Sequence, residues 1–382
     1  MNITDDANNE DVANSPFRGV GGKFIIAGGG TGGHIFPAIA IANALKQLQP
    51  QAEILFVGAK GKMEMEKVPQ AGYNIKGLDI AGFNRSSLIK NISLPFKLIK
   101  SFYQVRQIVN EFKPVAVIGV GGYSSFPVLK YAQSRGIPTF IHESNSFAGK
   151  ANIMLGKKAT RVFVAGDGME KFFPADKIVV TGNPVRKNIA ASTVSREEAL
   201  RFFDLKEDKV TILVVGGSLG AKSINEVILA HILDLAPLDL QLIWQTGKTH
   251  ADVYKERGKP LENVWVGEFI VEMDKAYAAA DVVISRAGAM AVTELCVVKK
   301  PVVFVPYPHA AEDHQTVNAR HLVEKDAAVM VKDSEAHAKL FPEIITLAKS
   351  ASLQEKLKKN IAQLAITDAD IKIAREILVS VQ

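Results

Sequence analysis

Two glycine-rich segments, each placed between an apolar run and a helical pattern, constrain the fold of this chain most. The first is residues 28–34 (Gly-Gly-Gly-Thr-Gly-Gly-His) after the apolar run 24–27, and the second is residues 216–221 (Gly-Gly-Ser-Leu-Gly-Ala) after 211–215. A strand, a tight glycine turn and a helix N-terminus together direct backbone N–H groups and the positive end of a helix dipole toward an anion. Two such units predict an α/β chain with two doubly wound, Rossmann-like domains that face a cleft.

Strand and helix patterns alternate along the whole chain, which is typical of parallel α/β sheets. In the first half the expected strands are residues 24–27, 54–57, 115–120, 139–143, 161–164 and 178–181. In the second half they are residues 210–215, 240–244, 264–266, 282–284, 302–305 and 328–331. Between the halves lie a turn at 182–186 and a charged helical stretch, with Ser195 as its expected N-cap and Glu198 three residues later.

These patterns predict a disordered tail at residues 1–22, a first domain at 23–184 and a second domain at 185–382. The pattern leaves open whether the last helix packs on the second domain or back on the first. The chain has 382 residues, of which 47% are apolar and 23% charged, so two domains with ordinary cores are feasible.

The sequence favours a reducing, cytoplasmic location. The single cysteine, Cys296, rules out a disulfide framework, and its apolar neighbours favour a buried side chain over a reactive thiol. No apolar run reaches the roughly 18 residues of a membrane span, and residues 1–20 lack the apolar core of a signal peptide. We therefore expect a soluble protein that can still attach to a membrane surface.

The distribution of charge says more than its total. The net charge of +6 is weak evidence for a nucleic-acid partner, and no RNA-binding motif accompanies it. We therefore expect no nucleic-acid partner. Residues 80–110 contain no acid but carry basic residues among many apolar ones, including Lys90, Lys97 and Lys100. Such a stretch is either an amphipathic core helix with lysines on its solvent-exposed face or a surface that binds anionic lipid headgroups.

The first glycine segment also fits the dinucleotide fingerprint, with Gly28, Gly30 and Gly33. A dinucleotide site needs an acid at the end of the second strand, but here the nearest acid, Glu53, precedes that strand. An NAD-dependent dehydrogenase is therefore disfavoured. His34 begins the next helix, where the helix N-terminus would keep it a neutral base; alternatively it only caps its own turn.

No metal or cofactor is expected. The group His309, Glu312, Asp313, His314 and His321 matches no zinc or di-metal spacing, and no Asp-x-Asp motif ends a strand.

Two polar side chains in the second half are candidates for sugar binding. Glu294 follows the turn at 285–288 and could accept hydrogen bonds from both hydroxyls of a ribose, or could simply complement a helix dipole. Gln315 could bind sugar hydroxyls through its amide, or face solvent on its helix.

Taken together, the motifs resemble one family closely, in order, from residue 23 to about residue 380. They are residues 29–38, 121–123, 142–145, 182–186, 216–221, 286–294, 314–315 and 318–319. They resemble the MurG family, the peptidoglycan GlcNAc transferases of the GT-B fold. The resemblance implies inverting transfer of GlcNAc from UDP-GlcNAc to the MurNAc 4-hydroxyl of lipid I, giving lipid II and UDP.

The resemblance also implies roles for particular residues. His34 would be the base or orient the acceptor. The donor would be bound by Thr31, Gly32, Gly33, Asn145, Arg186, Ser218, Ile270, Ala289, Met290, Ala291, Val292, Thr293, Glu294 and Gln315. Within this set Ile270 would hold the uracil through its backbone, Glu294 the ribose and Gln315 the GlcNAc hydroxyls. Ser144 and Met290 depart from the residues usual in the family.

The implied partners are UDP-GlcNAc, lipid I, an anionic membrane surface met by Lys90, Lys97 and Lys100, and other cell-wall synthesis proteins. The implied location is peripheral, on the cytoplasmic face of the bacterial inner membrane. Without a metal motif, the helix N-terminus after residue 218, helped by Arg186, would stabilise the charge on the leaving UDP. The alternatives are another UDP-sugar glycosyltransferase or epimerase of the same fold, and a non-catalytic nucleotide-sugar-binding module.

Overall fold

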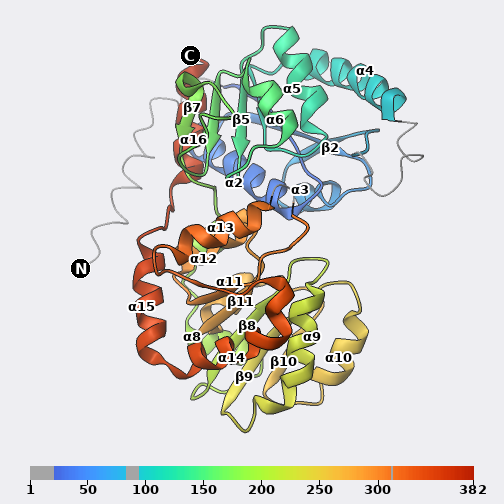
Figure 1. Cartoon of the computed structure of the whole chain (residues 1–382). Helices are drawn as coiled ribbons and strands as arrows, with labels where there is room; N and C mark the ends of the chain where they lie inside the picture. Colours follow the sequence, from blue (N-terminus) through green and yellow to red (C-terminus); the bar gives the residue numbers. More distant parts are fainter. Residues whose placement is uncertain (1–20, 83–93, 311–312) are drawn as a thin grey trace. The chain divides into compact units, whose positions relative to one another are not determined.

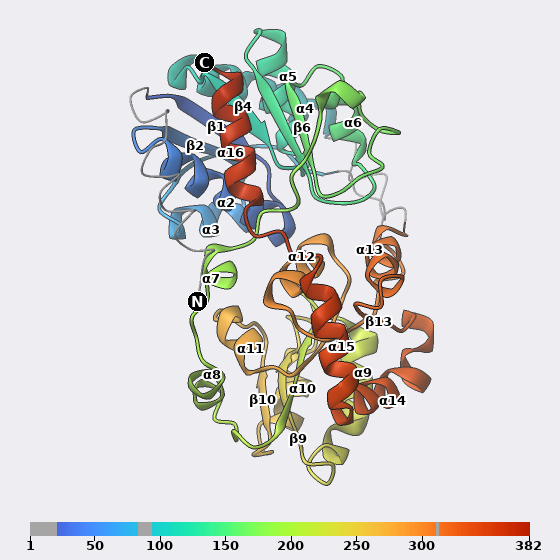
Figure 2. The same ribbon diagram turned by 90° about the vertical axis from the view of Figure 1, so that its left-hand side faces the viewer.

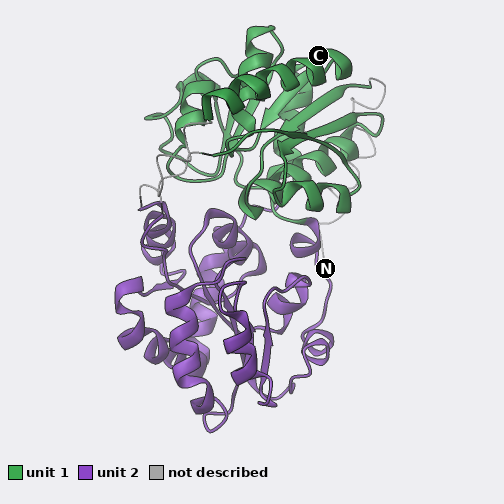
Figure 3. Ribbon diagram, turned by 90° about the vertical axis from the view of Figure 1, so that its right-hand side faces the viewer, with its two compact units in different colours: residues 1–186, 368–382 green, residues 187–367 purple. Residues whose placement is uncertain are grey.

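The computed structural model describes residues 21–82, 94–310 and 313–382, which form two compact units (Figure 3). Unit 1 comprises residues 1–186 and 368–382, and unit 2 comprises residues 187–367. The chain therefore changes unit after Arg186, two residues later than the sequence suggested, and returns to unit 1 for its last helix.

Unit 1 contains a seven-stranded parallel sheet in the order β3-β2-β1-β4-β5-β6-β7. Its strands are β1 (Lys23–Ala27), β2 (Glu53–Ala59), β3 (Asn74–Leu78), β4 (Ala116–Gly119), β5 (Thr139–Glu143), β6 (Arg161–Val164) and β7 (Ile178–Val180). Its helices are α2 (Gly32–Leu48), α3 (Glu64–Gln70), α4 (Leu94–Phe112), α5 (Ser125–Ser134), α6 (Lys150–Gly156) and α16 (Ala369–Ser380).

Both faces of this sheet are buried, as alternate residues of β1 show. Phe24 and Ile26 belong to a core shared with α2 and α16, whereas Ile25 and Ala27 belong to a core on the opposite face, shared with α4, α5 and α6. Figure 2 shows α16 running beside α2 across the sheet. A strand buried on both sides reads as a continuous apolar run, which is why the sequence pattern identified β1.

Unit 2 has a six-stranded parallel sheet in the order β10-β9-β8-β11-β12-β13 (Figure 1). Its strands are β8 (Val210–Val215), β9 (Leu240–Gln245), β10 (Val264–Gly267), β11 (Val282–Ser285), β12 (Val302–Phe304) and β13 (Val329–Met330). Its helices are α7 (Lys187–Ala190), α8 (Arg196–Phe202), α9 (Lys222–His231), α10 (Ala251–Gly258), α11 (Met273–Ala279), α12 (Ala289–Val298), α13 (His314–Val323), α14 (Ala336–Lys349) and α15 (Ala351–Ala362).

The predicted cap of α8 is confirmed: Ser195 Oγ accepts the Glu198 N–H at 3.1 Å. The sequence analysis missed strand β3, the edge strand of the first sheet. The predicted tail boundary is also placed too late, because the Gly22 carbonyl accepts the Glu53 N–H at 2.8 Å. Residues 1–20 lie outside the described residues.

Candidate functional site

The first glycine segment forms a tight loop between β1 and α2. Gly28, Gly29 and Gly30 have φ angles of 153°, 145° and 89°, which favour glycine. The Gly29 N–H donates to the Gly121 carbonyl at 3.3 Å, and a Cβ on Gly122 would lie 2.4 Å from the Gly29 oxygen. The loop after β1 and the loop after β4 therefore approach each other as closely as backbone allows.

A carboxylate lies beneath this loop. Glu64, the first residue of α3, is 1% exposed. Its Oε2 accepts the Gly30 N–H at 2.8 Å, and its Oε1 accepts the Ala59 N–H at 2.9 Å. Glu64 therefore links the loop after β1 to the end of β2.

His34 lies in the first turn of α2, beside the same loop. Its Nδ1 is 3.1 Å from the Gly29 carbonyl oxygen and 3.4 Å from Thr31 Oγ1. A carbonyl oxygen can only accept, so Nδ1 carries the proton in this hydrogen bond and Nε2 holds the lone pair. The imidazole is thus held by one nitrogen and basic at the other.

Burial lowers the pKa of His34 below its ordinary value, and it outweighs the opposing influence of the Gly29 hydrogen bond and of the Glu143 and Glu64 charges. A lowered pKa is in the direction expected for a neutral imidazole. The largest cause is loss of hydration on burial.

The end of β5 carries a second buried carboxylate, Glu143. Its Oε1 accepts the Asn145 N–H at 3.1 Å and the Asn145 Nδ2 at 3.3 Å. Its Oε2 accepts the Gly149 N–H at 3.0 Å and the Asn152 Nδ2 at 2.9 Å. The predicted donor-binding Asn145 is therefore held in place by Glu143.

His142, the residue before Glu143, is 1% exposed. Burial lowers its pKa to about 4. Hydrogen bonding of the imidazole to the Asn183 side chain opposes this shift, while the nearby His34 adds to it. The site in unit 1 thus contains two imidazoles that stay neutral at neutral pH.

The second glycine segment links β8 to α9 in unit 2. Gly217 and Gly220 have φ angles of 86° and 83°. A Cβ on Gly220 would lie 2.2 Å from the Thr246 oxygen, so the loop packs tightly against the end of β9. Ser218 is exposed on this loop, and its carbonyl accepts the Lys248 N–H at 3.0 Å.

Ile270, the expected uracil contact, is buried in the segment after β10. Its N–H already donates to Gln245 Oε1 at 3.0 Å, while Gln245 Nε2 donates to the Gly217 carbonyl at 3.3 Å. Gln245 therefore connects the glycine loop to the Ile270 segment. A uracil at this position would hydrogen-bond to the Ile270 carbonyl or displace Gln245 from the Ile270 N–H.

Glu294 lies in the second turn of α12 and is 6% exposed. Its Oε2 accepts the Tyr277 hydroxyl at 3.2 Å from α11. The burial and the hydroxyl partner distinguish Glu294 from an ordinary dipole-complementing glutamate on a helix surface. The residues that precede it on α12, from Ala289 to Thr293, are partly exposed.

Gln315 is held by its carbonyl group. Its Oε1 accepts the Ala287 N–H at 3.2 Å and the Tyr307 N–H at 3.0 Å, which leaves its amide NH₂ as the group that can bind a hydroxyl. In the same region Arg286 donates to Asp333 Oδ1 at 2.5 Å and to the Val305 carbonyl at 2.9 Å. These bonds fix the loop before α12.

Arg186 lies at the end of unit 1, although we assigned it to the second domain. Its guanidinium lies 4.7 Å from the centre of the Phe36 ring on α2. The structure therefore places Arg186 beside the His34 helix and within unit 1.

Helix α4 carries two of the three lysines expected to meet a membrane; Lys90 lies outside the described residues. Lys97 is exposed, while Lys100 Nζ lies 2.9 Å from Asp79 Oδ2. Lys100 and Lys60 hold the pKa of Asp79 down at about 2. The same helix exposes four large apolar side chains: Phe96 (74%), Ile99 (70%) and Tyr103 (72%) most fully, and Leu98 (36%) less.

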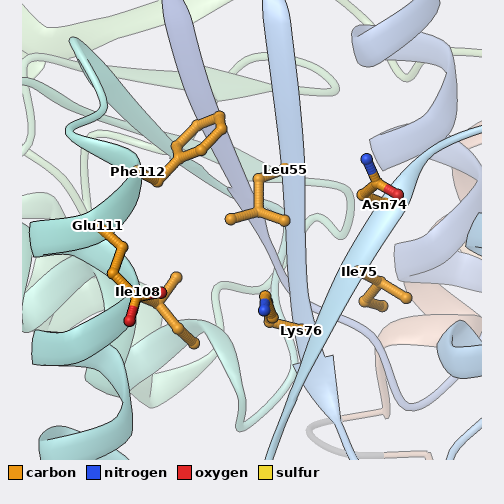
Figure 4. Close-up of a pocket in the computed structure, with 7 residues that line it drawn as sticks. All are labelled: Leu55, Asn74, Ile75, Lys76, Ile108, Glu111 and Phe112. Atoms are coloured by element: carbon orange, nitrogen blue, oxygen red, sulfur yellow. The ribbon is translucent and has the colours of Figure 1, made fainter.

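A separate hollow of about 540 Å³ lies at the outer edge of unit 1, between α4, β2 and β3 (Figure 4). It is lined by Leu55, Asn74, Ile75, Lys76, Ile108, Glu111 and Phe112. It contains none of the expected site residues. Within the described ranges, no helix has the length and apolar content to cross a membrane, and no three metal-binding side chains gather.

Comparison with known proteins decides the family. The glycosyltransferase family 28 N-terminal domain matches residues 24–164, and the family 28 C-terminal domain matches residues 211–373. A Bacteroides fragilis protein is 52% identical over 93% of this chain and 95% of its own length. A Flavobacterium psychrophilum protein is 50% identical over 93% of this chain and 97% of its own. Both are named UDP-N-acetylglucosamine–N-acetylmuramyl-(pentapeptide) pyrophosphoryl-undecaprenol N-acetylglucosamine transferase.

Among solved structures, Acinetobacter baumannii MurG superposes with a TM-score of 0.73 at 31% identity, covering 93% of this chain and 99% of that one. The chain belongs to the MurG family. A Staphylococcus aureus MnaA structure with UDP has a TM-score of 0.66 at 16% identity over 93% of this chain and 96% of that one, which shows a common fold only. The expected GT-B fold and glycosyltransferase class are thus confirmed.

Three residues that the sequence analysis did not assign make hydrogen bonds to the candidate site. Glu64, Gln245 and Tyr277 each hydrogen bond to a loop or to a side chain expected to bind substrate. Gln245 ends a buried strand, which is a usable signal for a site residue in a parallel sheet. Glu64 and Tyr277 lie in helices that carry no motif, so nothing in the sequence distinguished them.

Proposed function

We propose that this chain transfers GlcNAc from UDP-GlcNAc to the MurNAc of undecaprenyl-pyrophosphoryl-MurNAc-pentapeptide, lipid I, giving lipid II. The observation that carries the proposal is the 52% identity over 93% of the chain to a relative named for this reaction. The structure adds a basic imidazole in unit 1 and a buried carboxylate suited to a ribose in unit 2.

The proposed donor site in unit 2 follows the carboxyl ends of its strands. The uracil would lie against Ile270, the ribose against Glu294, and the diphosphate at the loop of Ser218 before α9. The GlcNAc hydroxyls would meet the Gln315 amide and the start of α12, Ala289 to Thr293. From unit 1 we assign Thr31, Gly32, Gly33, Asn145 and Arg186 to the sugar and diphosphate end.

The proposed reaction is a single in-line displacement. The acceptor 4-hydroxyl oxygen bonds to the anomeric carbon while the bond from that carbon to the UDP oxygen breaks, which inverts the configuration. His34 Nε2 takes the hydroxyl proton, because Nδ1 is committed to the Gly29 carbonyl. The N–H groups at the start of α9 stabilise the charge that develops on the departing UDP.

Incubation with UDP-GlcNAc labelled in the sugar and a soluble lipid I analogue tests this function. We expect label in the acceptor product and one UDP released per transfer. Release of UDP with free GlcNAc, or epimerised UDP-sugar and no labelled acceptor, would overturn it. The second outcome would favour the alternative of a nucleotide-sugar epimerase with the same fold.

We further propose that the protein works peripherally on the cytoplasmic membrane face, with helix α4 as its attachment surface. The acceptor's diphosphate is tethered to a lipid, so the enzyme must reach the bilayer. The exposed Phe96, Ile99 and Tyr103 supply apolar contact, and Lys97 supplies attraction to anionic headgroups. Lys100 is a weaker contributor than expected because Asp79 shares its charge.

A further inference from the structure

Glu64 is a buried charge that the proposed reaction does not use. It is 1% exposed and makes hydrogen bonds to two backbone N–H groups, those of Gly30 and Ala59. A carboxylate removed from water is costly unless hydrogen bonds compensate it, so the burial of Glu64 depends on these two N–H donors.

The surrounding backbone is shaped to admit this side chain. A Cβ on Gly29 would lie 2.4 Å from the Glu64 carboxyl carbon, and a Cβ on Gly58 would lie 2.5 Å from its Cγ. Two glycines on different strand ends therefore leave the space that Glu64 fills. Any side chain at either position would displace the carboxylate from the loop.

The hydrogen bonds connect Glu64 to the imidazole in three steps. Glu64 Oε2 binds the N–H of Gly30, Gly30 follows Gly29 in the loop, and the Gly29 carbonyl receives Nδ1 of His34 at 3.1 Å. The direction of that carbonyl is set by the peptide plane it shares with the Gly30 N–H. Holding the N–H thus aims the carbonyl at the histidine.

We propose that Glu64 is a positioning residue that fixes the tautomer of His34, by orienting the Gly29–Gly30 peptide so that Nδ1 carries the proton and Nε2 the lone pair. This rests on the proposed function in that His34 is taken as the base. It assigns Glu64 no contact with either substrate.

The charged groups that face His34 give the proposal an electrostatic readout. The charges of Glu64 and Glu143 raise the pKa of His34, whereas His34 and His142 disfavour each other's protonation. Replacing Glu64 by glutamine removes one of the two negative charges. The pKa of His34 should therefore fall further, while Glu143 and His142 stay unchanged.

The test compares Glu64→Gln with Glu66→Gln, an exposed glutamate on the same helix. Glutamine keeps one oxygen for one of the two N–H groups but presents NH₂ to the other, so the loop loses a hydrogen bond. We expect kcat to fall on the order of 10²-fold, as for a small misplacement of a catalytic group. The dissociation constant of UDP, measured by calorimetry, should stay unchanged, and Glu66→Gln should match the wild type in both.

Imidazole nitrogen NMR on selectively labelled protein supplies a readout independent of activity. In the wild type His34 should show the Nδ1–H tautomer, and in Glu64→Gln a mixture of tautomers with a lower pKa. A wild-type Nε2–H tautomer would overturn the proposal even if the variant fails to fold. A folded Glu64→Gln with wild-type tautomer, pKa and kcat would overturn it as well. Absence of transfer in the wild type would instead count against the proposed function, since the NMR result does not depend on it.

Discussion

At the residue scale, the first test concerns His34, which we propose as the base because its Nδ1 bonds to the Gly29 carbonyl and burial lowers its pKa. His34→Ala should lower kcat by roughly 10²–10⁴-fold, because proton transfer acts mainly in the transition state. The KM for UDP-GlcNAc should change little. Steady-state kinetics with a soluble acceptor measures both, and a variant with near-normal kcat would leave His34 as a residue that only caps its own turn.

The Glu294 carboxylate allows a separate test of the nucleotide site. Glu294→Ala should weaken UDP binding by about 1–3 kcal/mol, because the ribose hydroxyls lose a buried acceptor. Calorimetric titration of UDP and 2′-deoxy-UDP measures this, and the wild type alone should discriminate between them. Tyr277→Phe removes the hydroxyl that binds Glu294 but keeps the ring, so its affinity for UDP should lie between those of the wild type and of Glu294→Ala. Equal UDP affinity in wild type and Glu294→Ala would refute the ribose assignment.

His142 links the site to stability in acid. Its pKa is about 4 in the folded state, against an ordinary value near 6.5, so below pH 6.5 the unfolded chain binds more protons. Its contribution to stability is complete above pH 6.5 and is lost as the pH falls toward 4, and it is on the order of 3 kcal/mol.

Urea unfolding of the wild type and of His142→Gln between pH 7 and pH 4 would measure this effect. The wild type should lose stability more steeply over that range, since glutamine does not titrate. Parallel curves for the two proteins would show that His142 does not contribute.

At the scale of elements, the sequence predicted what rests on continuous apolar runs and glycine turns. Strands such as β1 and β8 are buried on both sides and were recognised, whereas β3 (Asn-Ile-Lys-Gly-Leu) alternates exposed and half-buried residues at a sheet edge. The roles of Glu64 and Tyr277 depend on contacts between separate elements. No local pattern encodes such a contact, and so these roles required the structure.

Helix α4 gives a prediction at this scale. Phe96→Ser combined with Ile99→Ser should reduce sedimentation with phosphatidylglycerol vesicles by roughly tenfold or more, since a fully buried large apolar side chain contributes about 1.5–3 kcal/mol. Activity on a short soluble acceptor should persist. These substitutions avoid Lys100, whose change to glutamate would place a second acid beside Asp79.

Leu233→Ser is the matched control, because Leu233 is 70% exposed but lies in unit 2. It should sediment with vesicles like the wild type. Equal loss in both variants would indicate general apolar adhesion, and full sedimentation of the α4 variant would place the attachment surface elsewhere.

At the scale of the whole molecule, each unit has its own core. The unit 2 core surrounds β8 to β12, and the unit 1 cores surround β1 on its two faces. UDP at 100 times its dissociation constant should therefore stabilise residues 187–367 by about 2.7 kcal/mol. Hydrogen exchange should slow in β8, β9 and α12 and stay nearly unchanged in β1 and β5. Equal protection of both sheets would contradict a nucleotide site carried by unit 2.

The return of α16 to unit 1 has a consequence for how the protein is made. The core that α2 shares with β1 is completed by Ile373, Ala374, Ile377 and Leu378, which are synthesised after all of unit 2. Every strand of unit 1 is synthesised before unit 2 begins, but part of its apolar surface stays uncovered until α16 emerges from the ribosome. Unit 2, whose residues are contiguous, can close its core first. Unit 1, whose synthesis starts first, therefore completes its core after unit 2 does.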